Sequence, residues 1–599
     1  MGTSKKSLLT KFLIWRIKHI SQKQFVLMLS MVVGLISGLG AVLIKNLTYL
    51  IQSLLEGRLI SNYHSAFYFV FPLLGILFTA LFMRYVLRHT VSHGIPSTLY
   101  AISKKKGVIR RFQMFGSLIA APLTVGFGGS VGLEGPTVAT GAALSSNLAR
   151  LLHLNQATRT LLIGCAAAGA MSSIFKAPIA AIIFAVEVFS LDLTLLSLVP
   201  LLLASVTAII TSYFFFGNDI LLPFTVVDTF SIGDIPFYLI LALVAGLVSI
   251  YFTNTYEWIQ KQFDTIANKW HRMLVGGVLI GVLVYCIPPL YGEGFDVINN
   301  LVQGNANLAL ENNLFNASTE HIYTTIGLLI GLVIFKIIAS ALTFGAGGVG
   351  GIFAPTLFMG SIMGYTVALV LRTVGFDSAN ISISNFTLVG MAGLMAGVLH
   401  APLTAIFLIA ELTGGYALFI PLMITAAVAY SITKYVHPHS VYTMELGRKG
   451  ELITHNKDHA VLTLMDLESV VEQNFIALTP KMNLGEIVSK GIVKSNRNIF
   501  PVVTADSGQL LGIILLDDLR PVMFERQLYD EMTARDLMQE PPGLVELDKD
   551  RMTDVMKKFQ DTGAWNLPVV RAGVYQGFVS KSKLLTVYRR KLIDFSGAS

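Results

Sequence analysis

The sequence predicts a polytopic all-α membrane protein that carries a soluble α+β region at its C-terminal end. Charged residues are only 13% of the 599 residues, against about 25% in soluble domains. Apolar residues are 53% and the mean hydropathy is +0.65. A soluble protein of this size could not cover its surface with so few charges, which excludes a soluble enzyme, a disordered chain and a secreted disulfide scaffold.

The charged residues are divided unevenly along the chain. Residues 1–440 contain 24 lysines and arginines and 15 acidic residues, whereas residues 441–599 contain 20 and 21. The proportion of charged residues in the second segment is that of an ordinary soluble domain. We therefore expect a long membrane domain that ends near His439–Glu451 and a compact soluble domain after it.

The first membrane-spanning helix is expected in the apolar run from Phe25 to Leu43, which is long enough to cross a bilayer. Six basic residues precede it, so the positive-inside rule predicts that residues 1–24 form a cytoplasmic segment. A second basic block, residues 104–111, is expected on the same side. Basic residues at the ends of apolar segments explain the net charge of +8 without a nucleic-acid partner.

Eleven further apolar stretches follow, and several are short or interrupted by glycine and proline. Such segments at corresponding positions of two halves are typical of transporters built from a repeat. The stretches lie at about 67–87, 113–127, 136–152, 160–189, 194–216, 236–256, 273–289, 324–343, 352–373, 387–411 and 417–435.

A duplication is visible in the apolar region. An Ala-Pro pair precedes a glutamate by nine residues in both halves, at Pro178 and Glu187 and again at Pro402 and Glu411. The glycine-rich segments 128–141 and 347–360 match at nearly the same offset. These matches predict one duplication, but they leave open whether the two copies insert parallel or inverted.

The soluble tail contains a second repeat. Residues 499–503 and 512–514 recur as residues 566–570 and 577–579, and a helix-like segment precedes each copy at 484–491 and 552–562. A β-branched run, a turn, a short strand and the start of a helix predict an α+β unit used twice.

Glu134 is the strongest candidate for a functional residue in the membrane region. Ionisable groups are costly inside a bilayer, and Glu134, Glu187 and Glu411 are the three carboxylates set well inside apolar sequence. Glu134 lies in a glycine cluster beside Pro136, which fits the first turn of a helix. A helix N-terminus binds anions, so the carboxylate can occupy an anion site until protonation removes its charge.

The matching segment of the second half has no carboxylate. There the backbone amides of Ile352 and Phe353 would face an anion directly. Two such helix starts directed at one point indicate a protein that transports anions. The alternative interpretation is that the glycines only allow membrane helices to pack closely.

These motifs resemble those of the CLC family of chloride channels and proton-coupled chloride transporters. Residues 132–136 resemble the family's GREGP motif, residues 351–355 its GxFxP motif, residues 92–96 its GSGIP motif, and Tyr442 its pore tyrosine. The resemblance covers residues 25–445 and implies an inverted repeat of about eighteen helices, assembled as a homodimer. It also implies a gating or proton-transfer role for Glu134 and an anion site at His93, Gly94, Ile95, Gly132, Gly135, Ile352, Phe353 and Tyr442.

Departures from the family pattern bear on mechanism. His93 stands where the family has a serine, which puts the selectivity for chloride over other small anions in question. Val188 stands at the position of the inner proton-transfer glutamate, which favours a voltage- or pH-dependent channel. A proton-coupled antiporter that uses Glu134 with a different inner proton path is the alternative. Glu187 and Glu411 are expected to be structural carboxylates at helix ends.

The tail resembles the tandem CBS domains of many family members, with a linker at 446–463 and domains at 464–526 and 531–593. Such pairs bind nucleotides through a hydroxyl residue and an aspartate, but the first copy has Leu515 with Asp518 and the second Ser580 with Lys583. We expect dimerisation and packing from the tail and no cofactor. Weak binding of an adenine nucleotide at Asp518 and Ser580 is the alternative.

The sequence thus predicts a multi-pass transporter of chloride or a similar anion, with protons as a second candidate partner, and no enzyme activity. We expect it in the cell (inner) membrane, with its N-terminus and CBS domains in the cytoplasm. No histidine is followed by glutamate, which excludes a zinc protease of the His-Glu-x-x-His type, and neither cysteine has metal-site spacing. A membrane receptor with a ligand-sensing CBS tail is the alternative from another class.

Overall fold

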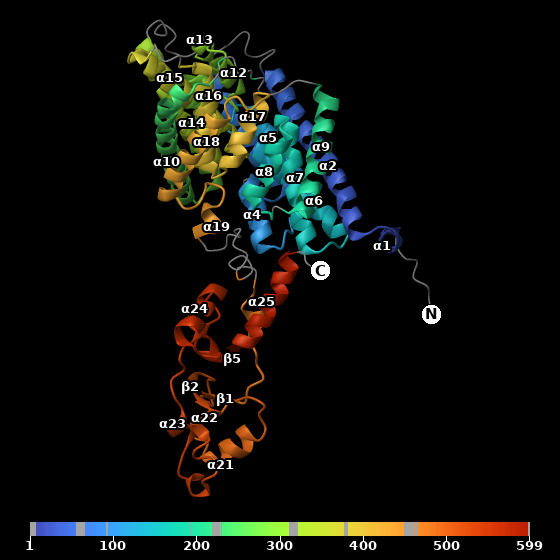
Figure 1. The fold of residues 1–599 in the computed structure, drawn as a ribbon, viewed down its shortest axis with the longest axis vertical. Helices are drawn as coiled ribbons and strands as arrows, with labels where there is room; N and C mark the ends of the chain where they lie inside the picture. Colours follow the sequence, from blue (N-terminus) through green and yellow to red (C-terminus); the bar gives the residue numbers. More distant parts are fainter. Residues whose placement is uncertain are drawn as a thin grey trace. The chain divides into compact units, whose positions relative to one another are not determined.

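The structure of the protein is a computed structural model. It describes residues 8–55, 66–91, 94–192, 194–217, 224, 228, 230–310, 322–376, 381–448, 462 and 465–596. The chain forms two compact units, Met1–Lys449 and Gly450–Ser599. Figure 1 shows the helices of the first unit and the helices and strands of the second.

The described part of the first unit is built from helices, and nine of them are long and apolar enough to cross a membrane. The helices of its first half are α1 (Leu8–His19), α2 (Gln22–Leu55), α3 (Ala66–Leu81), α4 (Gly94–Lys104), α5 (Gln113–Gly126), α6 (Glu134–Leu151), α7 (Gln156–Phe175), α8 (Pro178–Phe189) and α9 (Leu195–Phe216). Those of its second half are α10 (Ile235–Thr265), α11 (Lys269–Cys286), α12 (Phe295–Val302), α13 (Ala306–Ala309), α14 (Ile322–Gly345), α15 (Phe353–Thr373), α16 (Ile383–Leu399), α17 (Pro402–Leu412), α18 (Phe419–Val436) and α19 (Met444–Arg448).

Two of the predicted apolar stretches, 160–189 and 387–411, each contain two helices. Lys176 ends α7 and His400 ends α16, and both take the left-handed backbone conformation with φ of 55°. An Ala-Pro pair then begins α8 and α17, because the residue before a proline disfavours the helical conformation. The same break therefore recurs at the same place in both halves.

The contacts between α8 and α17 show that the duplicated halves are inverted. Glu187, near the C-terminal end of α8, accepts hydrogen bonds from the backbone N–H groups of Leu403 and Thr404 in the first turn of α17, at 3.0 and 2.8 Å. Glu411, near the C-terminal end of α17, accepts two hydrogen bonds from the first turn of α8, also at 3.0 and 2.8 Å. Each helix therefore ends where the other begins, so these two equivalent helices run antiparallel. Both glutamates close helix ends, as predicted.

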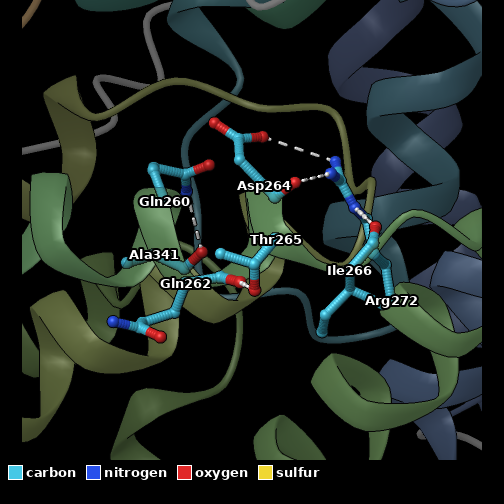
Figure 2. A network of polar contacts seen from close by, with 7 residues as sticks. All are labelled: Gln260, Gln262, Asp264, Thr265, Ile266, Arg272 and Ala341. Carbon is cyan, nitrogen blue, oxygen red and sulfur yellow. Dashed lines mark hydrogen bonds and ion pairs between the residues drawn. The ribbon is translucent and has the colours of Figure 1, made fainter.

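Figure 2 shows how the polar junction between α10 and α11 is closed. Arg272 of α11 donates hydrogen bonds to the backbone carbonyls of Ile266 and Asp264, at 2.6 and 3.0 Å. Arginine at this position satisfies the carbonyls that a helix end leaves unpaired. Gln260 joins α10 to α14 through the carbonyl of Ala341, at 3.0 Å.

The second unit contains the predicted α+β unit twice. In the first copy β1 (Ile499–Val503) pairs antiparallel with β2 (Leu510–Leu515), and in the second β4 (Asn566–Arg571) pairs antiparallel with β5 (Val574–Ser580), with β3 (Val545–Glu546) parallel to β4. Both hairpins have a register shift at the same place, after Val502 and after Val569. The helices of this unit are α21 (Leu484–Glu486), α22 (Leu516–Leu519), α23 (Ala534–Leu537), α24 (Met552–Thr562) and α25 (Lys581–Ser596).

Each copy buries its own apolar core. Phe500 and Ile514 of the first hairpin are fully buried with Leu484 and Leu519 from the flanking helices. The second core includes Val569 of β4. This duplication confirms the α+β class predicted for the tail, while the boundaries 464–526 and 531–593 stay predictions.

Candidate functional site

The two glycine-rich loops of the duplicated halves meet backbone to backbone. The N–H of Gly132 donates to the carbonyl of Gly351 at 2.8 Å, and the N–H of Gly351 donates to the carbonyl of Gly132 at 2.7 Å. A β-carbon on Gly351 would lie 2.9 Å from the backbone nitrogen of Gly135. The segments that begin α6 and α15 can approach this closely only because these positions carry no side chain.

The beginning of α4 packs against the same point. A β-carbon on Gly94 would lie 2.6 Å from the carbonyl carbon of Gly135, and the neighbouring Ile95 is 1% exposed. His93, which precedes Gly94, lies outside the described residues. Three helix starts, those of α4, α6 and α15, therefore converge at Gly135.

Glu134 is the first residue of α6 and its side chain is fully buried. Neither carboxylate oxygen has a hydrogen-bond partner among the described residues. The carboxylate turns back over Gly132, since a β-carbon on Gly132 would overlap its Oε2 atom. It also lies close enough to the backbone N–H of Ala354, in the first turn of α15, to interact with it. A single carboxylate thus lies where the two helix starts meet.

Tyr442 also lies near this carboxylate. Its side chain is 5% exposed, its hydroxyl group has no hydrogen-bond partner among the described residues, and it interacts electrostatically with Glu134. A buried hydroxyl normally has a partner. The Tyr442 hydroxyl can therefore donate to a ligand without giving up a hydrogen bond within the protein.

Ile352 and Phe353 contribute mainly backbone to the site. Their side chains are 4% and 0% exposed. The ring of Phe353 packs against Phe175 and Phe184, with ring centroids 5.1 and 6.2 Å apart. These aromatic contacts fix the first turn of α15, whose N–H groups carry the positive end of the helix dipole.

Two charged residues near the site were missed by the sequence analysis. Lys336 is fully buried in α14 and donates to the carbonyl of Gly292 at 3.0 Å. Glu293 accepts a hydrogen bond from the backbone N–H of Leu133 at 2.9 Å. The lysine inside the apolar stretch 324–343 was a visible signal, whereas Glu293 lies in a polar break that gave none.

The candidate nucleotide residues of the tail already have protein partners. The Ser580 hydroxyl donates to Glu472 and accepts from the backbone N–H of Lys583, both at 3.1 Å. Asp518 accepts from the side chain of Gln539 at 2.8 Å. Within the part of the chain that the structure describes, no hydrogen bond or ion pair joins Asp518 to Ser580, and no group of histidine, cysteine or acidic side chains could hold a metal ion.

Comparisons with known proteins match both regions of the chain. A family model described as voltage gated chloride channel matches residues 74–434, and a CBS domain model matches residues 467–525. A putative chloride channel protein ClcB-like of Ralstonia nicotianae is 29% identical over 63% of this chain and 85% of its own length. An H⁺/Cl⁻ exchange transporter ClcA of Vibrio cholerae is 28% identical over 71% of this chain and 89% of its own length.

A solved structure of a eukaryotic CLC transporter has the same fold over nearly the whole chain. It covers 96% of this chain and 99% of its own, with a TM-score of 0.58 and 18% sequence identity. This similarity extends through the tail as well as the helical unit.

Proposed function

Because the chain belongs to the CLC family of chloride channels and transporters, we propose that it moves chloride, or a similar small anion, through the point where α6 and α15 begin. The observation that carries the proposal is the fully buried carboxylate of Glu134 at this point, whose oxygens have no hydrogen-bond partner among the described residues. Two helix N-termini favour negative charge there, and a carboxylate and an anion compete for the same place.

Glu134 is the proposed gate. While ionised, its carboxylate takes the place of the anion between the two helix starts. Protonation removes the negative charge, so the backbone amides then favour an incoming anion over the neutral side chain. Anion flow should therefore increase as the pH falls.

Tyr442 and His93 are proposed to line the inner side of the anion path. An anion that leaves water needs hydrogen-bond donors that replace its hydration shell. The Tyr442 hydroxyl can supply one of them, because it has no partner among the described residues. His93 would supply another and set the preference among small anions.

We propose channel activity rather than proton exchange, because Val188 is a buried apolar residue where an inner proton carrier would need a titratable group. A proton-coupled antiporter is the second candidate, favoured by the 28% identity to an H⁺/Cl⁻ exchange transporter. Both functions use Glu134, and they differ in whether proton movement is tied to anion movement.

The two functions are separated by reversal potentials in crossed gradients of chloride and pH. A channel reverses at the chloride equilibrium potential, whatever the pH gradient. An exchanger reverses at a potential that moves with both gradients. A reversal potential that shifts when the pH gradient alone is changed would therefore overturn the channel proposal.

We also propose an oligomeric state and a membrane orientation for the protein. We propose a homodimer with one pore in each subunit, and a membrane orientation with the N-terminus and the tail in the cytoplasm, as the resemblance to the family implies. The basic residues before α2 support this orientation through the positive-inside rule. The tail is proposed to assemble or regulate the protein without forming part of the pore.

A further inference from the structure

The loop formed by residues 291–294, which follows α11, contacts the segment that leads into α6. Tyr291 donates from its hydroxyl to the carbonyl of Gly126 at 3.2 Å, and the N–H of Gly292 donates to the carbonyl of Gly128 at 3.4 Å. A β-carbon on Gly128 would overlap the Tyr291 ring. The 291–294 loop is therefore fixed against the segment that positions Glu134.

Glu293 of this loop reaches the beginning of α6. Its Oε1 atom accepts the hydrogen bond from the N–H of Leu133, the residue immediately before Glu134. The two carboxylates interact as like charges. As a whole residue Glu293 is partly exposed, whereas Glu134 is fully buried.

Three charged groups face Glu293 from three different helices. Lys336 of α14 and Lys45 of α2 attract its carboxylate, and Glu134 of α6 repels it. The ammonium group of Lys336 also lies 4.5 Å from the centre of the Phe358 ring, which keeps it in place. Burial raises the pKa of the Glu293 carboxyl to about 7, although the hydrogen bond from Leu133 and the two lysines act in the opposite direction.

We propose that Glu293 is a positioning residue for the gate: its carboxylate holds the first turn of α6 through Leu133, and its charge controls how readily Glu134 takes up a proton. This inference rests on the proposed gating role of Glu134. A carboxyl group that has another negative charge close to it holds its proton more tightly than an isolated carboxyl group does. The two carboxylates therefore titrate as a coupled pair, and acid opens the gate at a higher pH than Glu134 alone would allow.

The test is the pH dependence of anion flux from liposomes that contain the purified full-length protein. Glu293→Gln keeps an oxygen that can accept the hydrogen bond from Leu133 but removes the charge. We expect its half-maximal flux at a pH lower by about one unit than in the parent protein. Glu293→Asp keeps the charge on a shorter side chain, so this variant should retain most of the parent pH profile.

Three further variants make the result decisive. Asp296→Asn removes a neighbouring exposed acidic charge and should leave the profile unchanged. Glu134→Gln should abolish the pH dependence, and adding Glu293→Gln to it should then have no further effect on the pH profile. Thermal melting of each variant shows whether the protein is folded.

The outcomes distinguish this inference from the proposed function on which it rests. If Glu134→Gln abolishes the pH dependence while folded Glu293→Gln has the midpoint of the parent, the role of Glu293 is wrong and the gate stands. An equal shift in Asp296→Asn would also contradict the inference, because it would reflect surface charge in general. If Glu134→Gln keeps the parent profile, both the gate and the role of Glu293 are wrong.

Discussion

Gly132 and Gly351 hydrogen-bond to each other in both directions, at 2.8 and 2.7 Å. They are equivalent positions of the two inverted halves, so the repeat brings its two glycine loops together at a single point. The two helix starts that follow therefore act on one place in the protein instead of forming two separate sites.

The absence of a side chain at Gly132 should be necessary for the closed position of Glu134. In Gly132→Ala the new methyl group would overlap Oε2 of Glu134 and lie 2.9 Å from the β-carbon of Ala354. We expect the carboxylate to be displaced, so that flux at neutral pH rises and its pH dependence weakens. We also expect a loss of stability of about 1–3 kcal/mol from overpacking.

Gly331→Ala is the matched control for this prediction. Gly331 lies in α14, and a β-carbon there would meet no atom within 4 Å. Alanine favours a helix over glycine by up to about 1 kcal/mol, so this variant should keep the parent flux and at least the parent stability. Parent-like gating in folded Gly132→Ala would show that Glu134 does not close over this glycine.

The reciprocal caps of Glu187 and Glu411 should contribute to stability and not to transport. Replacing either residue with alanine leaves two N–H groups in the first turn of the opposite helix without their acceptor. The expected cost is about 1–3 kcal/mol for each variant, measured as thermal melting in detergent. Reversal potentials should stay those of the parent, and altered coupling at unchanged stability would instead assign these carboxylates to a proton path.

Tyr442→Phe should weaken anion binding without destabilising the fold. The Tyr442 hydroxyl has no hydrogen-bond partner among the described residues, so its removal should leave the melting temperature unchanged or raise it slightly. If the hydroxyl is a ligand of the anion, chloride affinity measured by calorimetry should fall by about five- to tenfold, the equivalent of one hydrogen bond. Unchanged affinity would place the hydroxyl away from the anion.

The tail should bind adenine nucleotides weakly at most. The hydroxyl of Ser580 is engaged by Glu472 and by the first turn of α25, and Asp518 is engaged by Gln539. Leu515 offers no hydroxyl group in the first copy. Calorimetric titration of the full-length protein with ATP should therefore give little heat, and an affinity in the micromolar range or tighter would make the tail a nucleotide sensor.

The sequence predicted the parts of the site that depend on local chemistry. Glu134 was visible because it is a carboxylate in an apolar, glycine-rich segment, and the Ala-Pro pairs marked the duplication. The duplication alone did not give the direction of the second copy, which only the family resemblance implied, because the direction depends on contacts such as that of Glu187 with α17, more than 200 residues away in the chain. Glu293 was missed for the same reason, since its partner Leu133 is 160 residues away.

The most direct test of the account is the pH dependence of chloride flux in Glu134→Gln. Glutamine has nearly the size of the protonated glutamate but cannot ionise, so it cannot compete with an anion for the two helix starts. We expect chloride flux that is high and independent of pH, with no proton movement coupled to it. Flux that falls with rising pH as steeply in Glu134→Gln as in the parent protein would contradict the account, because the gate would then lie elsewhere.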